Sequence, residues 1–228
     1  MKRSFYVAVI SLILALASVW LVGSIIIHPI NHAVTRPAGF DAQDVSIPGV
    51  GHTIAAWWVD AGAGSPAVLL VHGARADRTD MIDRARLLQR YGFSVLLIDL
   101  QGHGETLGEA ITFGYRESRD VTATLAWLKS STGPPRKIGI IGCSLGGAAT
   151  LLASQPTGAD ALVLESVYPR VTRAVENRLR MRVGPLAAAI APLLLWQLPL
   201  RFHLATLDLE PIRHVAAVGA PVLIIAGT

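Results

Sequence analysis

The chain has 228 residues, of which 52% are hydrophobic and only 16% are charged. Disordered chains are rich in charge and poor in apolar residues, so this composition excludes disorder. A single cysteine excludes a disulfide-stabilised scaffold, and the length fits one folded domain. The net charge of +4 does not indicate a nucleic-acid partner, because no aromatic residues alternate with the arginines clustered between Arg170 and Arg182. That cluster is typical of a solvated helix face or, alternatively, of a contact with anionic lipid headgroups.

The N-terminal segment carries no charge from Ser4 to Ile27. As a helix, these roughly 24 residues would span about 36 Å, which is enough to cross a hydrocarbon core about 30 Å thick. We therefore predict a transmembrane helix over about 4–27, within an N-terminal part (1–40) that ends in a short linker. Because Lys2 and Arg3 precede the helix, we expect a cytoplasmic N-terminus and a domain on the periplasmic or extracellular side.

A cleaved signal peptide is the alternative interpretation of this segment. The sequence Ala15-Leu16-Ala17 fits a cleavage site, and cleavage there would give a secreted protein. The apolar run continues well beyond Ala17, however, whereas the apolar part of a signal peptide usually ends before its cleavage site. The uncleaved membrane anchor is therefore the favoured prediction.

The remainder, residues 41–228, alternates short apolar runs with amphipathic stretches. Strands that alternate with helices predict an α/β fold with a mostly parallel, doubly wound sheet. Ligands bind such sheets at the carboxyl ends of the strands. In chain order, the patterns predict strands at 44–48, 52–60, 67–72, 94–99, 137–141, 161–165 and 222–226, and helices at 78–91, 114–131 and 145–154.

A second uncharged stretch covers residues 183–200. Its length would permit another membrane span, but three prolines and Gln197 interrupt it, and a second span would place the last strand on the wrong side of the membrane. We predict instead a lid of short apolar helices over about 167–215. An apolar lid favours an apolar or acyl-bearing substrate and contact with the bilayer surface.

The sequence Gly142-Cys143-Ser144-Leu145-Gly146 follows the predicted strand at 137–141 and opens the predicted helix at 145–154. This is the G-x-S-x-G pattern in the strand–turn–helix context that gives it meaning. The turn is tight, so the small residues Gly142 and Gly146 are needed on either side of the serine. The helix N-terminus also favours negative charge that develops at the site. We predict Ser144 as a nucleophile and Cys143 as a buried structural thiol.

Two more motifs precede the serine: Val71-His72-Gly73-Ala74 after a buried strand, and the loop Asp99-Leu100-Gln101-Gly102-His103-Gly104-Glu105-Thr106. With these three motifs, the chain from about residue 43 onward resembles the α/β-hydrolase superfamily. The likeness is closest to the membrane-anchored serine hydrolases of the BEM46-like and serine-aminopeptidase-like groups. The resemblance implies an oxyanion hole formed by the backbone N–H groups of Ala74 and Leu145. It also implies that His72 and His103 shape their loops rather than catalyse.

The resemblance further implies the chain order serine, acid, histidine, with the acid after the strand at 222–226 and the histidine one strand later. The histidines that follow Ser144, His203 and His214, both precede that strand. We therefore expect a C-terminally truncated sequence whose acid and histidine lie beyond Thr228. Glu165 is an alternative acid, and His203 or His214 an alternative base.

These observations predict a serine hydrolase that cleaves an ester, thioester or amide bond through an acyl-Ser144 intermediate. The expected partners are a small-molecule or acyl/peptide substrate and, through the N-terminal helix, the lipid bilayer. No metal or organic cofactor is expected, because the sequence has no ligand-spaced His/Cys cluster. Two alternatives remain open: a non-catalytic binding or scaffold protein with this fold, and an acyltransferase that uses the same serine.

Overall fold

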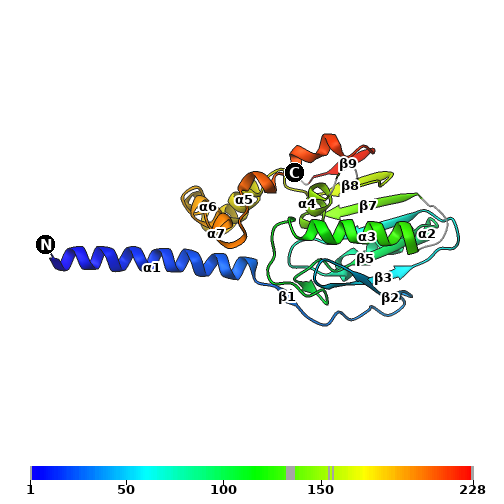
Figure 1. The fold of residues 1–228 in the computed structure, drawn as a ribbon, viewed down its shortest axis with the longest axis horizontal. Coiled ribbons are helices and arrows are strands. Elements are labelled where there is room, and N and C mark those ends of the chain that lie inside the picture. The colour runs from blue at the N-terminus through cyan, green and yellow to red at the C-terminus, as the bar shows by residue number, and fades with distance from the viewer. Residues whose placement is uncertain (1, 132–136, 154, 156, 227–228) are drawn as a thin grey trace.

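The structure, a computed structural model, describes residues 2–131, 137–153, 155 and 157–226. Met1, Ser154 and the pair Gly227-Thr228, on which some of the expectations above fall, lie outside the described residues. Helix α1 (Lys2–Ile27) projects from the globular part of the molecule, and its N-terminal portion stands clear of every other element (Figure 1).

A seven-stranded sheet forms the centre of the described part, in the order β2-β3-β5-β4-β7-β8-β9. The pairs β2–β3 and β3–β5 are antiparallel, and all other neighbours in this sheet are parallel. The predicted mostly parallel sheet is therefore confirmed. Its strands are β2 (Gln43–Pro48), β3 (Thr53–Val59), β4 (Ala67–Val71), β5 (Ser94–Ile98), β7 (Ile138–Cys143), β8 (Ala161–Glu165) and β9 (Val222–Ile225).

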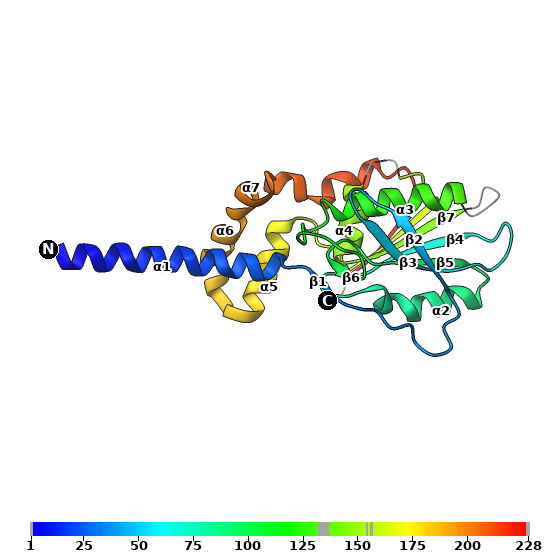
Figure 2. The same ribbon diagram turned by 60° about the horizontal axis from the view of Figure 1, so that its bottom comes forward.

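Helices cover both faces of the sheet. A 3-10 turn (Arg78–Met81) and α2 (Ile82–Arg90) pack on one face, and α3 (Glu117–Ser131) and α4 (Leu145–Leu152) pack on the other (Figure 2). In β4, Val68 faces α2 while its neighbour Leu69 faces the α3 and α4 side. Both faces of this strand are buried, which explains why its sequence shows no polar alternation.

Two predicted helices begin later than expected. Asp77 accepts a hydrogen bond from Thr79 N (2.7 Å) and caps a 3-10 turn over Arg78–Met81, and the α-helix begins only at Ile82. The buried carboxylate of Glu117 accepts from the N–H groups of Thr112 (2.7 Å) and Gly114 (3.0 Å). These bonds keep residues 112–116 in a loop ahead of α3.

Between β8 and β9 the chain forms α5 (Val171–Val183), α6 (Ala187–Leu195), α7 (Gln197–Phe202) and several 3-10 turns (Gly184–Leu186, Thr206–Leu209 and Pro211–Ala217). Lys2–Ile27 and Val171–Phe202 are both long and apolar enough to span a membrane, by length and composition alone. The second of these segments is not one continuous helix. It is interrupted between α5 and α6, where Gly184 adopts φ +59° and Pro185 follows. Because β8 and β9 are parallel neighbours in one sheet, Val171–Phe202 is part of the crossover that joins these two strands.

The segment after α1, expected to be a linker, packs on the domain. Ile30–Asn31 (β1) pairs in parallel with His103–Gly104 (β6). The Asn31 side chain donates to Thr106 O (2.7 Å), and further on Phe40 is buried against Trp57. No sequence pattern predicts this two-residue ladder, because it joins segments that are far apart in the chain.

His52 provides a test of the packing between the β2–β3 turn and α3. Its Nδ1 lies 3.2 Å from Val50 O and its Nε2 lies 2.8 Å from Asp120 Oδ1. Both ring nitrogens face acceptors, so the protonated ring satisfies both contacts, and the bond to Asp120 raises the pKa of His52 above its ordinary value.

A raised folded-state pKa stabilises the fold fully below the unfolded pKa of about 6.5, and this stabilisation is lost as the pH rises through the folded pKa. We therefore expect the difference in unfolding free energy between the wild type and His52→Gln to be largest near pH 6 and to shrink towards pH 9. Urea denaturation across this pH range measures it, and a difference that does not change with pH would contradict the assignment.

Candidate active site

The carboxyl ends of three adjacent strands carry residues with unusual backbone angles. Arg75 follows β4 with φ +61°, Ser144 follows β7 with φ +47°, and Ser166 follows β8 with φ +53°. Positive φ is disfavoured for residues with a side chain and persists only where the surrounding structure imposes it. This edge of the sheet is where parallel α/β folds bind ligands.

Ser144 occupies the sharp turn between β7 and α4, with φ +47° and ψ −107°. Its N–H donates to Glu165 O (2.8 Å) on β8, and its carbonyl accepts from Ala148 N (3.0 Å) in α4. The residue is partly exposed, and in the described part of the chain its hydroxyl makes no hydrogen bond. The backbone of Ser144 is therefore held on both sides while its hydroxyl remains available.

The glycines around Ser144 are places where the backbone passes too close for a side chain. A Cβ at Gly142 would lie 2.6 Å from Gly147 Cα, across the turn itself. A Cβ at Gly146 would collide with Val71 O and would lie 2.6 Å from His72 O, at the end of β4. The absence of a side chain at these positions lets α4 start directly against β4.

The loop after β4 lies against the Ser144 turn. A Cβ at Gly73 would be in ordinary contact with Ser144 Cβ, at 3.6 Å. The next residue, Ala74, is exposed. Among the described residues, neither Ala74 N nor Leu145 N, the first N–H of α4, donates a hydrogen bond. Two unpaired backbone donors therefore belong to segments that touch beside Ser144.

His72 supports this loop and is not placed to act as a base. Its Nδ1 donates to Gly73 O (2.8 Å) and its Nε2 accepts from Leu100 N (3.0 Å), so a single neutral tautomer satisfies both atoms. Burial and the neighbouring His103 ring lower the pKa of His72 to about 3. The expectation that His72 shapes its loop agrees with this geometry.

A buried ion pair fixes the 99–106 loop. Arg78, which is 2% exposed, pairs with Asp99 and with Glu105. Asp99 Oδ2 also accepts from Glu105 N (2.9 Å), and a Cβ at Gly104 (φ +48°) would collide with the Asp99 carboxylate. His103 Nδ1 contacts Gln101 O (3.0 Å), and burial lowers the pKa of this histidine.

Glu165, considered above as an alternative acid, lies beside the Ser144 turn but is bound by an arginine. Arg84 Nε lies 3.0 Å and 2.9 Å from the two carboxylate oxygens of Glu165, and the Arg84 terminal nitrogen contacts one of them as well. Cys143 packs on the α2 face next to this pair, and burial raises the pKa of its thiol. Sequence reasoning missed Arg84, because nothing in the helix 82–90 marks one of its arginines as the partner of a residue on β8.

The histidines after Ser144 lie elsewhere. His203 is exposed and ends α7 in the left-handed conformation. His214 lines a surface cavity of about 610 Å³ together with Tyr115, Ser118 and Asp208, and Ser144 is not among the residues that line it. In the part of the chain that the structure describes, no hydrogen bond joins either histidine to Ser144. The structure therefore does not bring the alternative base and the serine together.

Comparisons with known proteins agree with this architecture. The family model for the alpha/beta hydrolase family matches residues 68–227, so the chain belongs to that family. An uncharacterized protein of Mycobacterium tuberculosis is 33% identical over 195 residues, which cover 84% of this chain and 62% of the relative. YqkD, an uncharacterized protein of Bacillus subtilis, is 25% identical over 161 residues, which cover 69% of this chain and 53% of YqkD. The chain thus spans between half and two thirds of the length of these curated relatives.

Solved structures show the same fold. An esterase of Pyrococcus furiosus superposes with a TM-score of 0.66 at 19% identity, covering 87% of this chain and 76% of the esterase. The alpha/beta hydrolase GrgF from Penicillium superposes with a TM-score of 0.61 at 18% identity, covering 82% of this chain and 80% of GrgF. At these identities the likeness concerns the fold.

The close approach of α4 to β4 can be tested with two glycine substitutions. Alanine is intrinsically favoured over glycine in a helix, yet Gly146→Ala would press a methyl group against two backbone carbonyls that cannot move independently. We expect a loss of about 1–3 kcal/mol in unfolding free energy, measured by urea denaturation.

The matched control is Gly139→Ala in β7, where the new Cβ would meet Val68 Cγ2 at an ordinary 3.6 Å. We expect this variant to retain the wild-type stability within about 0.5 kcal/mol. Equal effects of the two substitutions would show that the approach of α4 to β4 is not the constraint described here.

Proposed function

We propose that this protein is a serine hydrolase that cleaves an ester, thioester or amide bond through an acyl-Ser144 intermediate. The observation that carries the proposal is the backbone of Ser144, whose positive φ at a strand–helix turn presents a free hydroxyl at the carboxyl edge of the sheet. A nucleophile that substrate must approach requires a turn of this kind, in which the backbone is strained and the hydroxyl is exposed.

The proposed oxyanion hole consists of the N–H groups of Leu145 and Ala74. In support, both donors are unpaired among the described residues, and their segments touch at Gly73 and Ser144. Two fixed donors stabilise the negative oxygen of a tetrahedral intermediate, and loss of one such donor typically costs about 3 kcal/mol of transition-state stabilisation. The start of α4 at Leu145 adds the positive end of a helix to the same position.

We further propose that the acid and the histidine of the triad are supplied by residues beyond Thr228. Arg84 binds Glu165, and both nitrogens of His72 are already bonded, which disfavours these two as triad members. Two further observations support the proposal. The curated M. tuberculosis relative is longer than the matched region, and the outermost strand β9 leaves Leu223, Ile224 and Ile225 about half exposed.

For α1 we propose an uncleaved membrane anchor with a cytoplasmic N-terminus, as in the BEM46-like and serine-aminopeptidase-like hydrolases that the motifs resemble. Its length, its mean hydropathy of 2.6 and the exposure of nearly all of its side chains support this role. A cleaved signal sequence would give the mature protein a new N-terminus near Ala17. N-terminal sequencing of the membrane-bound protein separates the two proposals.

The nucleophile is tested by labelling with a fluorophosphonate probe, which reacts with activated serines. We expect the full-length gene product to be labelled and Ser144→Ala to lose labelling completely, as read by in-gel fluorescence. Cys143→Ala is the matched control: it alters the neighbouring side chain, which packs on the α2 face, and should keep labelling within about twofold.

The same probe tests the position of the triad partners. We expect the 228-residue chain to react at least about 100-fold more slowly than a gene product that continues past Thr228, because the base would be missing. Equal rates would place the base within the 228 residues. Absence of labelling in both would favour a non-catalytic role for this fold.

A further inference from the structure

The exposed surface of residues 183–200, which form α6 and most of α7, is apolar. Residues 183–200 contain no charged side chain, and the large exposed side chains among them are all hydrophobic. Leu193, Trp196 and Leu200 lie at helical spacing on one face and are 45%, 62% and 54% exposed. An element that faces water normally carries polar residues on its outer side. We call the exposed residues Leu186, Leu193, Trp196 and Leu200 the lid face.

The most polar side chain in this stretch points inward instead. Gln197 is 3% exposed, and its Nε2 donates to Val19 O of α1 (2.9 Å). The arrangement is the reverse of that in a water-soluble helix: the polar side chain lies at a helix–helix contact and the apolar side chains face outward. Membrane-embedded helices show this pattern, in which polar residues join helices that are surrounded by lipid.

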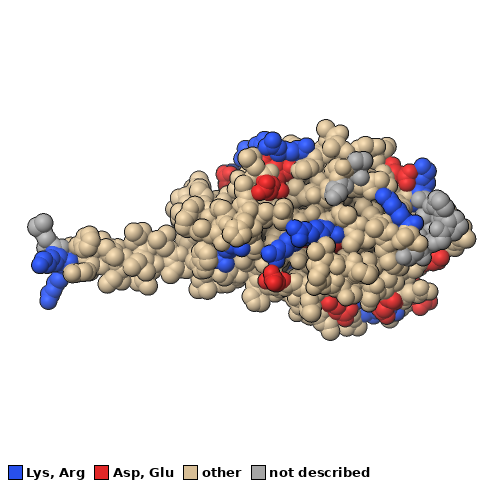
Figure 3. Space-filling model, viewed as in Figure 1, with Lys and Arg blue, Asp and Glu red and all other residues tan. Residues whose placement is uncertain are grey.

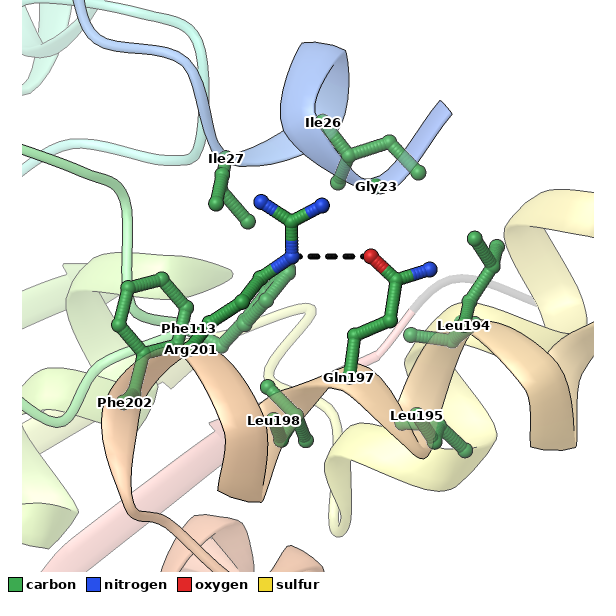
Figure 4. A pocket seen from close by; sticks show the side chains of 11 residues that line it. Gly23, Ile26, Ile27, Phe113, Leu194, Leu195, Gln197, Leu198, Arg201 and Phe202 are labelled. Atoms are coloured by element: carbon green, nitrogen blue, oxygen red, sulfur yellow. Dashed lines mark hydrogen bonds between the residues drawn. The ribbon is translucent and has the colours of Figure 1, made fainter. Parts of the chain in front are cut away.

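Arg201 completes the contact between α7 and α1. Its guanidinium stacks over the Trp20 ring at 3.8 Å and donates to Trp20 O (2.7 Å) and Ser24 Oγ (2.9 Å). Its Nε donates to Gln197 Oε1 (2.9 Å), as drawn in Figure 4. Gly23 lies between these partners, where a Cβ would approach Gln197 Cδ to 2.8 Å and Oε1 more closely still. We call Gly23, Gln197 and Arg201 the clamp.

The clamp sets the depth of the lid face relative to α1. Its contacts on α1 run from Val19 to Ser24, whereas the helix ends at Ile27. At about 1.5 Å per residue, these contacts lie roughly 5–12 Å before the end of α1. Half of a bilayer core is about 15 Å thick, so helices fixed at this level lie inside one leaflet if α1 spans it. Figures 1 and 2 both show α6 and α7 beside the domain-proximal part of α1.

The charged residues around the lid face fit the same depth. Helix α5 exposes Arg178, Arg180 and Arg182 just before the uncharged stretch begins. Arginines bind phosphate well and are favoured at the headgroup level of a membrane. Figure 3 shows that the shaft of α1 is uncharged between its basic tip and the globular part, and that the acidic residues on this face all lie on the globular part.

We propose that the lid face inserts into the phospholipid leaflet on the domain side of the membrane, and that the clamp holds it beside α1. The proposal rests on the anchoring role proposed for α1, but it does not depend on the chemistry proposed for Ser144. The occupant of the lid face is then lipid hydrocarbon, and the arginines of α5 meet the phosphates of the headgroups. Leu186, Leu193, Trp196 and Leu200 are thereby removed from water without any protein partner.

The test uses nitroxide spin labels on single cysteines in the full chain, in a Cys143→Ala background. The protein is reconstituted in vesicles of phosphatidylcholine and phosphatidylglycerol. Labels replace Leu193 and Leu200 in the lid face, Leu14 in the middle of α1, and Tyr91. Tyr91 is 75% exposed and ends α2, which lies away from α1 in Figure 2. Power-saturation measurements then compare collisions with oxygen, which concentrates in the bilayer core, with collisions with a water-soluble nickel chelate.

We expect labels at 14, 193 and 200 to collide mainly with oxygen and the label at 91 mainly with the nickel chelate. If the label at 14 collides mainly with oxygen but the labels at 193 and 200 collide mainly with the nickel chelate, as the label at 91 does, the lid face is in water. The insertion proposal is then overturned, while the proposed anchor stands. If the label at 14 also collides mainly with the nickel chelate, both the proposed anchor and the proposed insertion are wrong. Fluorophosphonate labelling of the same samples reports on Ser144 independently of these outcomes.

The clamp is tested with Gly23→Leu, whose side chain would occupy the space of Gln197. We expect the labels at 193 and 200 to become more accessible to the nickel chelate by at least about twofold, while the label at 14 is unchanged. Val22→Leu, at a neighbouring position that is 43% exposed, is the matched control and should leave all labels unchanged.

Gln197→Leu provides a second variant in case Gly23→Leu prevents folding. It keeps the size of the side chain and removes both the bond to Val19 O and the bond from Arg201. The same shift at 193 and 200 is expected. Unchanged depths in both variants would show that the clamp does not hold the lid face in place.

Discussion

The close backbone approach between the start of α4 and the end of β4 is the constraint on which the candidate site depends. Without side chains at Gly142 and Gly146, helix α4 begins directly against the carbonyls of Val71 and His72. Ser144, in the turn between β7 and α4, adopts its positive φ next to this contact. The same contact places the loop after β4 beside the turn, so the backbone of Ser144 and the loop that carries Ala74 share one packing requirement.

Several interactions around this contact serve to keep the loops still. His72 is locked in one tautomer between Gly73 and Leu100, and the buried pair Arg78–Asp99 holds the next loop. A buried charge that loses its partner is strongly destabilising, so Arg78 and Asp99 restrict each other to one arrangement. The hydroxyl of Ser144, by contrast, makes no hydrogen bond among the described residues, which is the arrangement expected where a reactive group must be accessible on a rigid support.

Much of the fold could be predicted from the sequence, because buried strands and amphipathic helices leave periodic patterns. The apolar run of β4 indicates a strand that is buried on both faces, and the glycines around Ser144 indicate a tight turn. Both features can be recognised from a few consecutive residues. The pairing of Arg84 with Glu165, by contrast, joins residues 81 positions apart, and an arginine on an amphipathic helix is expected to face water. The same holds for the contact of Gln197 with Val19. Such contacts depend on how helices and strands pack in three dimensions, and the pattern of residues along one sequence does not predict them.

The pairing of β1 with β6 has a consequence for how the molecule would meet its substrate. Asn31 and the backbone of Ile30 are hydrogen-bonded to the 99–106 loop immediately after α1 ends, so hydrogen bonds tie the end of α1 to the domain. If α1 is anchored, the site is held at a constant height and tilt above the bilayer. The rate at which substrate meets the site would then depend on the concentration of substrate in a thin layer at the membrane surface. It would depend less on the concentration of substrate in the surrounding solution. A lipid-soluble substrate that accumulates in that layer would reach Ser144 more often than a water-soluble one of equal bulk concentration.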